Sequence, residues 1–449
     1  MLRKTLLVLI IAVVIVGGAA AALAWRPAID PVRRPAAQSF DPALVKRGGE
    51  LAAIGNCATC HTRPGGQPFA GGAAVPTPFG TIYSTNITPD EATGIGAWSE
   101  AAFRRALHEG VDRGGRHLYP AFPYDHFTLI DDRDVSALYA FLMTRAPVAA
   151  NAPENDLRFP FNLRPLLAGW KLLFLRTGRF QPDPNQSTAW NHGAYLVNGL
   201  AHCGACHTPR NTLGAEERQR GFAGGEAEGW TAYALDATSP APMAWDADAL
   251  AFYLQNGWHR DHGVARGPMS EVTENLSTVP AADVRAIATY VASVADASSD
   301  QRRRKADSAR EQTKQAADAR MPGAAIYAAA CATCHDGSRP PPYGGIDLGL
   351  STGPSGPNLR NVINVILWGL PALDEQRRPI MPGFAGTLND RQLADLLAYV
   401  RARFSDKPPA PDLEKHIREA RAGEPRVTIH PAPTTEPGPR GPGHKEARE

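Results

Sequence analysis

Apolar residues follow a helical spacing in three pairs of segments along the chain. The second segment of each pair carries apolar residues at positions i, i+3, i+4 and i+7: residues 135–142, 284–291 and 393–400. The first segment of each pair begins with a glycine: residues 48–54, 193–200 and 323–330. This spacing is typical of helices that bury one face. We therefore expect a mainly α-helical protein with three repeated units, each opened and closed by one of these helices.

The segments between these helices divide the chain further. The three units are expected at residues 40–148, 185–297 and 321–405, with long loops rich in glycine and proline. Residues 149–184 and 298–320 are expected to be linkers, and the second linker is highly charged without an apolar face. Residues 406–449 are rich in Pro, Arg and Glu. Such a composition does not favour a folded core, so we expect a disordered tail there.

The first 25 residues have a pattern of their own. Two basic residues precede residues 6–24, which are almost entirely apolar. The small residues at 22–24 would suit cleavage of a signal peptide, whereas the length of the run and the following Trp25 favour an uncleaved membrane anchor. Residues 1–25 are therefore expected to be a transmembrane anchor or a signal helix. Both alternatives place the rest of the chain at the periplasmic face of a cytoplasmic membrane.

A second apolar segment, residues 158–176, lies in the first linker. Its apolar run is too short to span a bilayer, which needs about 20 residues. Trp170 and the flanking basic residues suit an interface with lipid headgroups or with a partner subunit. Packing of this segment against the chain's own units is an equally open alternative.

Composition and charge narrow the possible functions. The chain of 449 residues has 47 Lys and Arg against 45 Asp and Glu, a net charge of +2 that favours neither nucleic acid nor an acidic substrate. A hydrophobic content of 43% is ordinary for a globular protein. The 42 glycines and 40 prolines suit loops that wrap a large prosthetic group.

All six cysteines fall in three copies of one motif, C-x-x-C-H, which is the attachment motif of c-type haem. The copies are Cys57, Cys60 and His61; Cys203, Cys206 and His207; and Cys331, Cys334 and His335. Two thiols on one helical turn can each form a thioether to a vinyl group, and the adjacent histidine can bind the iron. A zinc site would need a second ligand pair nearby, and a redox dithiol would need a βαβ context. The sequence therefore predicts three covalent haem c groups, attached outside the cytoplasm.

Two methionines are candidates for the sixth iron ligand in the second and third units. Met269 lies 15 residues before Val284, and Met381 lies 12 residues before Leu393. Both are in loops rich in glycine and proline at matching offsets from the closing helix. A thioether in this position raises the reduction potential of a haem.

Five stretches resemble a known family: FDPALVKRGGELAAIGNCATCHT, PTPFGTIYSTNITPD, GRHLYPAFPYDHFT, GAYLVNGLAHCGACHTPRNTLGA and VRAIATYVASV. They are similar to the tri-haem cytochrome c subunits of membrane-bound periplasmic dehydrogenases that oxidise alcohols, aldehydes and sugars. The third stretch resembles members found with molybdenum hydroxylases of the xanthine dehydrogenase type, some of which oxidise N-heterocycles. The helix pairs resemble those of class I cytochromes c. The family's C-terminal membrane-associated helix is not evident in this chain.

The resemblance implies an electron-transfer subunit rather than an enzyme. Its partners would be a catalytic dehydrogenase subunit (molybdopterin protein, quinoprotein or flavoprotein) and, as acceptor, ubiquinone, a terminal oxidase or another cytochrome. Two other classes remain open: a haem enzyme that oxidises quinol or reduces peroxide, and a diffusing shuttle cytochrome.

The first unit departs from the family pattern at the sixth ligand. Many members have Met in a Pro-Ala-Met-Pro-Tyr loop, and here Phe122 occupies that position, 13 residues before Val135. His126 follows four residues later and is our candidate ligand, since imidazole binds haem iron well. His117 and a five-coordinate iron are the alternatives, while Met143 would need a different loop path.

Overall fold

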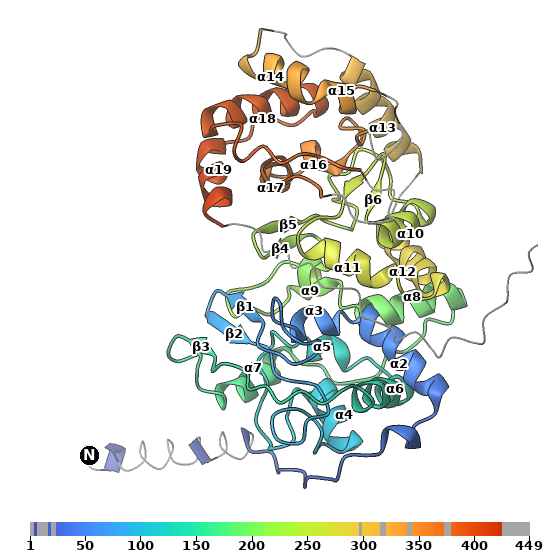
Figure 1. Cartoon of the computed structure of the whole chain (residues 1–449), viewed down its shortest axis with the longest axis vertical. Coiled ribbons are helices and arrows are strands. Elements are labelled where there is room, and N and C mark those ends of the chain that lie inside the picture. Colours follow the sequence, from blue (N-terminus) through green and yellow to red (C-terminus); the bar gives the residue numbers. More distant parts are fainter. Residues whose placement is uncertain are drawn as a thin grey trace, which may run out of the picture.

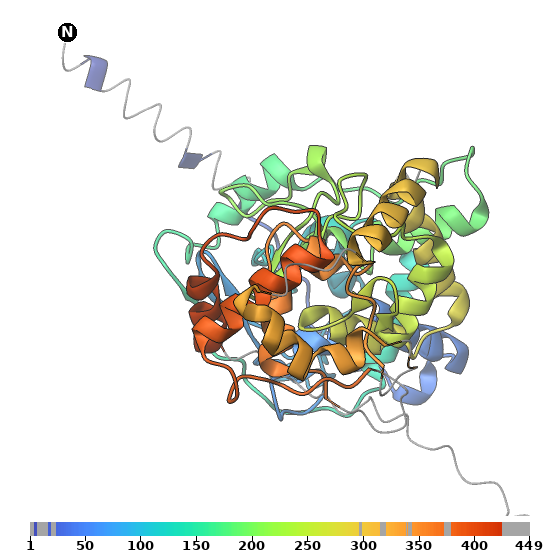
Figure 2. The same ribbon diagram turned by 90° about the horizontal axis from the view of Figure 1, so that it is seen from above.

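The computed structural model describes residues 4–6, 17–18, 24–295, 299–314, 320–337, 339, 344–371 and 379–423. These residues form an elongated body in which the chain advances along the long axis from the N-terminal part to the C-terminal part (Figure 1). Viewed from above, the parts of the body lie over one another (Figure 2). Most of the predicted anchor or signal at residues 1–25 lies outside the described residues.

No described helix combines the length and the apolarity that crossing a membrane requires.

Three pairs of crossed helices dominate the body. They are α2 (Pro42–Ile54) with α6 (Asp132–Met143), α8 (Thr188–Asn198) with α12 (Ala281–Val294), and α14 (Pro322–Ala330) with α18 (Asp390–Phe404). A glycine lies at each crossing: a Cβ on Gly48, Gly193 or Gly323 would come within 1.9, 2.0 or 2.1 Å of a main-chain oxygen of the facing helix. Only glycine allows two helices to approach so closely, which explains the glycine at the start of each predicted opening segment.

Side-chain caps fix where several of these helices begin. Asp41, Asp131 and Ser187 accept hydrogen bonds from main-chain N–H groups at the starts of α2, α6 and α8. At the start of α18, Asn389 and Gln392 form a reciprocal capping box. Each cap satisfies N–H groups that have no partner inside the helix.

Shorter helices and strands connect the pairs. The helices are α3 (Cys57–His61), α4 (Glu100–Glu109), α5 (Tyr124–Phe127), α7 (Leu166–Phe174), α9 (Gly204–His207), α10 (Ala247–Asn256), α11 (Pro268–Leu276), α13 (Ser299–Lys314), α15 (Ala332–His335), α16 (Thr352–Ser355), α17 (Arg360–Trp368) and α19 (Leu413–Ala422), with the 3-10 turns η1 (Ala37–Ser39) and η2 (Arg218–Arg220). One antiparallel sheet has the order β1 (Ala74–Thr77), β2 (Gly80–Tyr83), β3 (Asp156–Leu157). Val75 pairs with Ile82, and Thr81 pairs with Asp156. Two further hairpins are β4 (Gly225–Ala227) with β5 (Trp230–Ala232), and β6 (Trp258–His259) with β7 (Gly263–Val264).

We call the parts around the three helix pairs the first, second and third units. Buried side chains of the first and second units form one continuous hydrophobic cluster that includes Leu51, Leu138, Leu196 and Ile287. The third unit has a separate cluster, with Ile363 and Leu397 among its fully buried members. The units are therefore not equally independent of one another.

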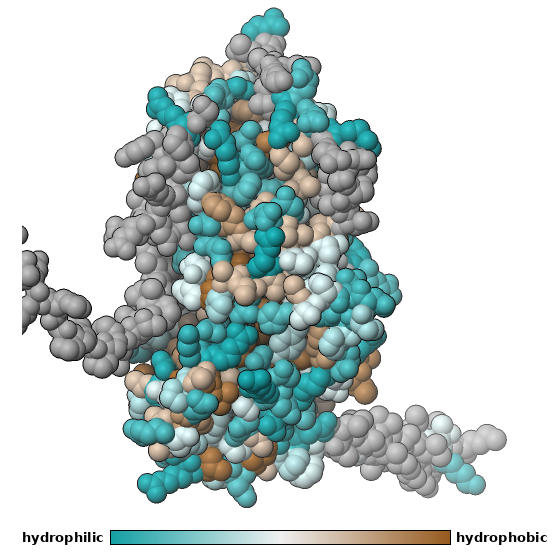
Figure 3. Space-filling model, turned by 90° about the vertical axis from the view of Figure 1, so that its right-hand side faces the viewer, coloured by the Kyte–Doolittle hydropathy of each residue, from teal (hydrophilic) through white to brown (hydrophobic). Residues whose placement is uncertain are grey.

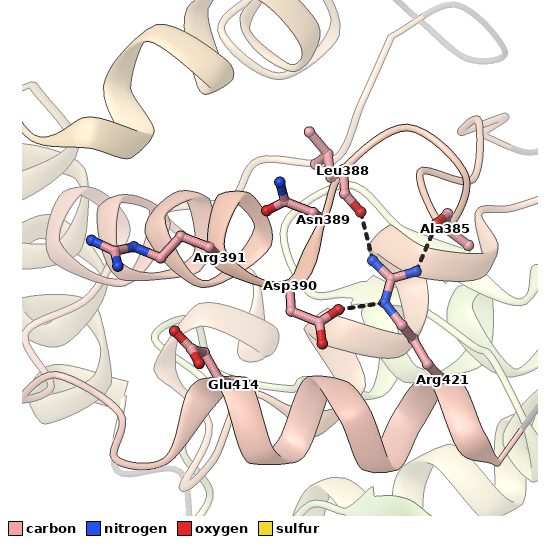
Figure 4. A pocket seen from close by; sticks show the side chains of 7 residues that line it. All are labelled: Ala385, Leu388, Asn389, Asp390, Arg391, Glu414 and Arg421. Carbon is pink, nitrogen blue, oxygen red and sulfur yellow. Dashed lines mark hydrogen bonds and ion pairs between the residues drawn. The ribbon is translucent and has the colours of Figure 1, made fainter.

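The two segments predicted to be a linker and a tail contain helices. The charged linker at 298–320 includes α13, in which Ala306 is buried. The expected disordered tail at 406–449 is wrong for residues 413–422, because α19 packs against the third unit through the fully buried Ile417. Arg421 of α19 donates to Asp390 at 2.7 Å and to the main-chain oxygens of Ala385 and Leu388, each at 2.6 Å (Figure 4). Residues 424–449 lie outside the described residues.

Candidate prosthetic-group sites

The three C-x-x-C-H motifs form the short helices α3, α9 and α15, each directly after the opening helix of its unit. Asn56 and His202, the residues before the first two motifs, adopt the left-handed conformation with φ of 51° and 38°. This turn ends the opening helix and starts the motif within a few residues. Each motif is thereby fixed to a crossed helix pair.

The thiols of Cys57 and Cys203 do not resemble those of a redox dithiol. Burial raises the pKa of Cys57 and of Cys203 to about 12, whereas a reactive dithiol needs a lowered pKa. A structural zinc site also lacks support. Among the described residues, the converging group of potential metal ligands is Asp125, His126 and Glu216, which contains no cysteine.

The histidine of each motif is held in the same way. Nδ1 faces a main-chain oxygen in all three units: His61 at 2.6 Å from Thr85, His207 at 2.7 Å from Tyr233, and His335 at 3.2 Å from Ile346. In the first two units this oxygen follows a hairpin, β1–β2 or β4–β5. Burial lowers the pKa of each histidine, and the hydrogen bond to the main chain only partly offsets this effect. A neutral imidazole whose Nδ1–H is donated leaves Nε2 with a lone pair, as an iron ligand requires.

One cavity of about 370 Å³ reaches from the second motif to the third. Its lining includes Cys203, Cys206 and His207 together with Cys331, Cys334 and His335, and both candidate methionines, Met269 and Met381. The remaining lining is mostly aliphatic and aromatic. The structure thus brings the predicted ligands of the second and third units together around one space.

Met269 lies in the first turn of α11 rather than in the predicted loop, whereas Met381 lies in a loop as predicted, and the chain near each of them depends on a glycine. Gly267 has φ of 60°, and a Cβ there would lie 2.3 Å from the Trp230 indole nitrogen. Gly369 has φ of 67°, and a Cβ there would lie 2.4 Å from the Met381 oxygen. Both positions therefore require glycine, which fixes the path of the chain before α11 and opposite Met381.

The cavity also contains polar atoms that lack a protein partner. Nδ1 of His262 and Oγ1 of Thr352 are buried without a hydrogen bond. His262 stacks on Trp245 with ring centroids 3.6 Å apart, and burial lowers its pKa to about 3. Orphaned buried donors are rare in folded proteins. An apolar group with carboxylates at one edge, such as a haem with its propionates, would fill the space and give these atoms partners. The residues present therefore fit the predicted group.

The first unit differs from the other two at the position of the candidate sixth iron ligand. Phe122, at the expected ligand position, packs its ring against Phe127 at 5.3 Å. The geometry does not support His126 as the sixth ligand, because both of its ring nitrogens are engaged. Nδ1 lies 2.7 Å from the Asn198 oxygen, and Nε2 lies 2.8 Å from Oε1 of Glu216.

His126 is engaged in this way because it lies beside the second unit, which supplies both Asn198 and Glu216. Both neighbours of the His126 ring, a main-chain oxygen and a carboxylate, are hydrogen-bond acceptors, which favours the imidazolium form. Burial alone would lower its pKa, but the hydrogen bond and the charge of Glu216 raise the pKa above its usual value. A cationic ring has no lone pair for iron.

The alternative candidate ligands of the first unit, His117 and Met143, also make other contacts. His117 places Nε2 2.8 Å from the Ala24 oxygen and Nδ1 3.0 Å from Nζ of Lys171. Met143 is fully buried in α6. His262 and Trp245 were not among the predicted residues, although His262 lies only seven residues before Met269 in a stretch rich in histidine.

Glycine-crossed helix pairs that hold C-x-x-C-H motifs, with the histidine donating Nδ1–H to the main chain, define a c-type cytochrome. Residues 45–146 match the family described as "Cytochrome c". Residues 318–400 match the family described as "Cytochrome C oxidase, cbb3-type, subunit III". Covalently bound haem c is the prosthetic group of such domains.

Full-length comparisons give a narrower assignment. The chain is 37% identical over 409 residues to the gluconate 2-dehydrogenase cytochrome c subunit of Pantoea cypripedii, covering 87% of this chain and 92% of that protein. It is 36% identical over 422 residues to the fructose dehydrogenase cytochrome subunit of Gluconobacter japonicus, covering 88% and 86%. The chain belongs to this family of cytochrome c subunits of dehydrogenase complexes, and it is an electron-transfer subunit rather than a catalytic one.

A third relative is much longer than this chain. It is a nicotinate dehydrogenase subunit of Pseudomonas putida, 46% identical over 405 residues, which cover 89% of this chain. The match spans only 34% of that relative, about a third of its length.

Proposed function

We propose that this chain carries three haem c groups, one in each unit, and relays electrons from a dehydrogenase to ubiquinone, a terminal oxidase or another cytochrome. The threefold arrangement of the motif histidines is the observation that carries this proposal. His61, His207 and His335 each direct Nδ1 to a main-chain oxygen and follow two thiols on a short helix.

The axial ligands follow from the same arrangement. His61, His207 and His335 would each hold one iron, and Met269 and Met381 would supply a further ligand to the second and third irons. The shared cavity supports both methionines. Phe122 leaves the first iron without a thioether, and its potential is expected to lie below the other two.

The partner is a catalytic dehydrogenase subunit. Identity of 46% to a nicotinate dehydrogenase subunit, together with the Pro-Ala-Phe-Pro-Tyr loop, favours a molybdopterin enzyme that oxidises an N-heterocycle or an aldehyde. Quinoprotein and flavoprotein partners remain the other members of the same class. The apolar residues 6–24 support a location of the complex at the periplasmic face of the cytoplasmic membrane.

Haem content tests the central proposal. A pyridine haemochrome assay against polypeptide concentration should give three haems per chain, and denaturing gels should retain haem on the polypeptide. Two or fewer haems in fully matured protein would contradict the proposal.

Reduction of the purified chain should require both the dehydrogenase and its substrate. Reduction by substrate alone would make the chain an enzyme.

Potentiometry tests the ligand assignment. Met269→Leu and Met381→Leu should each lower one potential by roughly 0.1–0.2 V, within the ~0.8 V range that axial ligands span. Phe122→Met is the matched variant in the first unit and should raise the lowest potential, because it supplies the missing thioether. Unchanged potentials in either methionine variant would remove that residue from the ligand set.

A further inference from the structure

Helix α7 is oriented against the usual rule for surface helices. It buries Lys171 beside Leu167 and exposes its other leucines: Lys171 is 8% exposed, whereas Leu172 and Leu173 are 75% and 69% exposed. A helix on a water-facing surface places its charged residues outward and its leucines inward. The outward face of α7 is therefore suited to an apolar environment.

The buried lysine fixes this orientation. Its Nζ donates to the main-chain oxygens of Glu109 and Gly110 at the C-terminal end of α4, at 2.7 and 2.5 Å, and lies 3.0 Å from Nδ1 of His117. A cation suits the negative end of a helix, where main-chain oxygens lack partners. Turning the leucines inward would leave these oxygens and the amine unsatisfied, so α7 cannot rotate to hide them.

The loop before α7 extends the exposed apolar surface. The α7 patch, as we call it, consists of large hydrophobic side chains that are all exposed: Phe159, Phe161, Leu163, Leu166, Leu172 and Leu173. By contrast, the face shown in Figure 3 carries hydrophobic residues in small groups among hydrophilic ones. A run of exposed apolar side chains of this size marks an interaction surface.

The charge around the patch indicates what covers it. Residues 157–181 contain five basic residues and no acidic residue. Arg158 and Arg176 at the ends of the segment are exposed. Exposed apolar side chains with an exposed arginine at each end of the segment match the boundary between acyl chains and anionic headgroups.

The end of the apolar N-terminal run lies beside α7. The Ala24 oxygen lies 2.8 Å from Nε2 of His117, the same ring whose Nδ1 faces Lys171. Ala24 is the last residue of the apolar run 6–24. One buried imidazole therefore connects that run to the helix that presents the patch.

We propose that the α7 patch inserts into the interfacial layer of a bilayer that contains anionic lipid, on the side from which residues 6–24 enter the first unit. This inference rests on the proposed placement of the chain at a membrane. It holds whether residues 6–24 are retained or cleaved, because the patch is complete without them. The first unit is then the unit nearest the lipid.

Depth measurement by spin labelling tests the insertion. The label is a nitroxide on Leu173→Cys in the full-length holoprotein, whose six native cysteines are consumed by thioethers. Phe252→Cys on α10, 41% exposed in the second unit, is the matched control. In phosphatidylglycerol-containing nanodiscs, the label at 173 should collide with oxygen several-fold more, and with a water-soluble nickel chelate several-fold less, than the label at 252.

Three results would overturn the proposal. The label at 173 could collide with the chelate as often as the label at 252, although the chain remains in the nanodisc. Protection of 173 could persist without lipid in a species of twice the mass, which would identify a second copy as the cover. Protection could also require the dehydrogenase subunit. Haem content and dehydrogenase-driven reduction, measured on the same sample, would show separately whether the electron relay fails.

Discussion

The second unit is joined to its two neighbours in different ways. Its joint with the first unit is filled by protein: the hydrophobic cluster is continuous, and a Cβ on Gly55 would touch the side chain of Leu200 at 3.0 Å. Polar contacts across this joint include Arg47 with Asp283 at 2.6 Å and the Tyr195 hydroxyl with Asp134 at 2.8 Å.

Its joint with the third unit surrounds the shared cavity. Hydrogen bonds lie around the cavity, such as the N–H of Thr352 donating to the His262 oxygen at 3.1 Å. The hydrophobic clusters of the second and third units are separate. The first joint is therefore filled by protein atoms, whereas the second joint depends on whatever fills the cavity.

The largest expected effect follows from leaving this cavity empty. At ~24 cal/mol per Å³, the full volume of about 370 Å³ would correspond to about 9 kcal/mol. Because the second and third motifs share this space, loss of one group leaves part of it unfilled and costs a corresponding part of that free energy. Cys203→Ser combined with Cys206→Ser should prevent covalent attachment in the second unit. Hydrogen exchange should then lose protection in α16 and α17, and small-angle scattering should show a longer particle, while α2 and α8 stay protected.

The matched variant is Cys57→Ser combined with Cys60→Ser, which removes the first attachment site instead. These thiols do not line the shared cavity. This variant should leave the second joint closed. Loss of protection at α2 and α8 in the Cys203 and Cys206 variant, with α17 unchanged, would reverse our comparison of the joints.

The next effect concerns the first joint and the pair His126–Glu216. Their side chains are only 12% and 11% exposed. Breaking a buried pair by removing one partner costs about 3–5 kcal/mol, because a charge is left unpaired. Glu216→Gln should therefore lower the free energy of unfolding in denaturant titrations by about that amount. Glu217→Gln, in an exposed pair with Arg220, should change it by about 0–1 kcal/mol.

The same pair makes stability depend on pH. Burial alone would lower the pKa of His126, but Glu216 raises it above 6.5, so its stabilisation is present below that value and is lost as pH rises through the folded pKa. Burial alone would raise the pKa of Glu216, but His126 and Arg210 lower it below 4.5, so its stabilisation is lost as pH falls through the folded pKa. The pair therefore stabilises the fold most between the folded pKa values of Glu216 and His126. Asp125 and His202 are the other titratable groups that face His126.

His126→Ala separates the structural role from iron binding. It should remove the alkaline loss of stability and leave the electron paramagnetic resonance of the irons unchanged. A lost low-spin ferric signal would instead restore His126 as a haem ligand.

The difference between the joints also explains what the sequence could predict. The C-x-x-C-H motifs, the glycine-led helices and the closing helices depend on residues close together in the chain, and the structure contains them all. The role of His126 depends on Glu216, 90 residues later. Its offset from Val135 carried no information about which unit its ring would face.

Long-range contacts account for the other differences as well. Proline and charged residues made the C-terminal segment resemble a tail, but Ile417 fills a site on the third unit and Arg421 binds the start of α18. The orphaned Nδ1 of His262 is recognisable only once the cavity is known. Local patterns could not supply either feature.

A smaller effect is expected at the helix crossings, which are alike in all three units. Gly193→Ala would place a Cβ 2.0 Å from the Ala286 oxygen, and overpacking of this kind typically costs about 1–3 kcal/mol. Gly48→Ala and Gly323→Ala should cost similar amounts, because their contacts are equally short. Gly169→Ala on α7 is the matched control: nothing lies within 4 Å, so it should stabilise by roughly 0.5–1 kcal/mol. Thermal unfolding in detergent measures all four, and equal effects at positions 169 and 193 would show that the crossings are not tightly packed.

The smallest effect is expected from a single side chain that spans the second joint. Asn361 of α17 accepts from the N–H of Thr231 and donates to its oxygen, both at 2.8 Å, and so pairs with strand β5. Asn361→Ala loses two hydrogen bonds of about 0.5–1.5 kcal/mol each, and water can replace part of them at this half-buried site. In the holoprotein the loss should be about 1 kcal/mol, because the filled cavity still holds the joint closed. In the Cys203 and Cys206 variant, these two hydrogen bonds are a much larger share of the contacts that still hold the second joint closed. Adding Asn361→Ala to that variant should therefore increase hydrogen exchange in α17 by more than the sum of the two separate effects. Strictly additive effects would mean that the joint is held by its hydrogen bonds rather than by the group in the cavity.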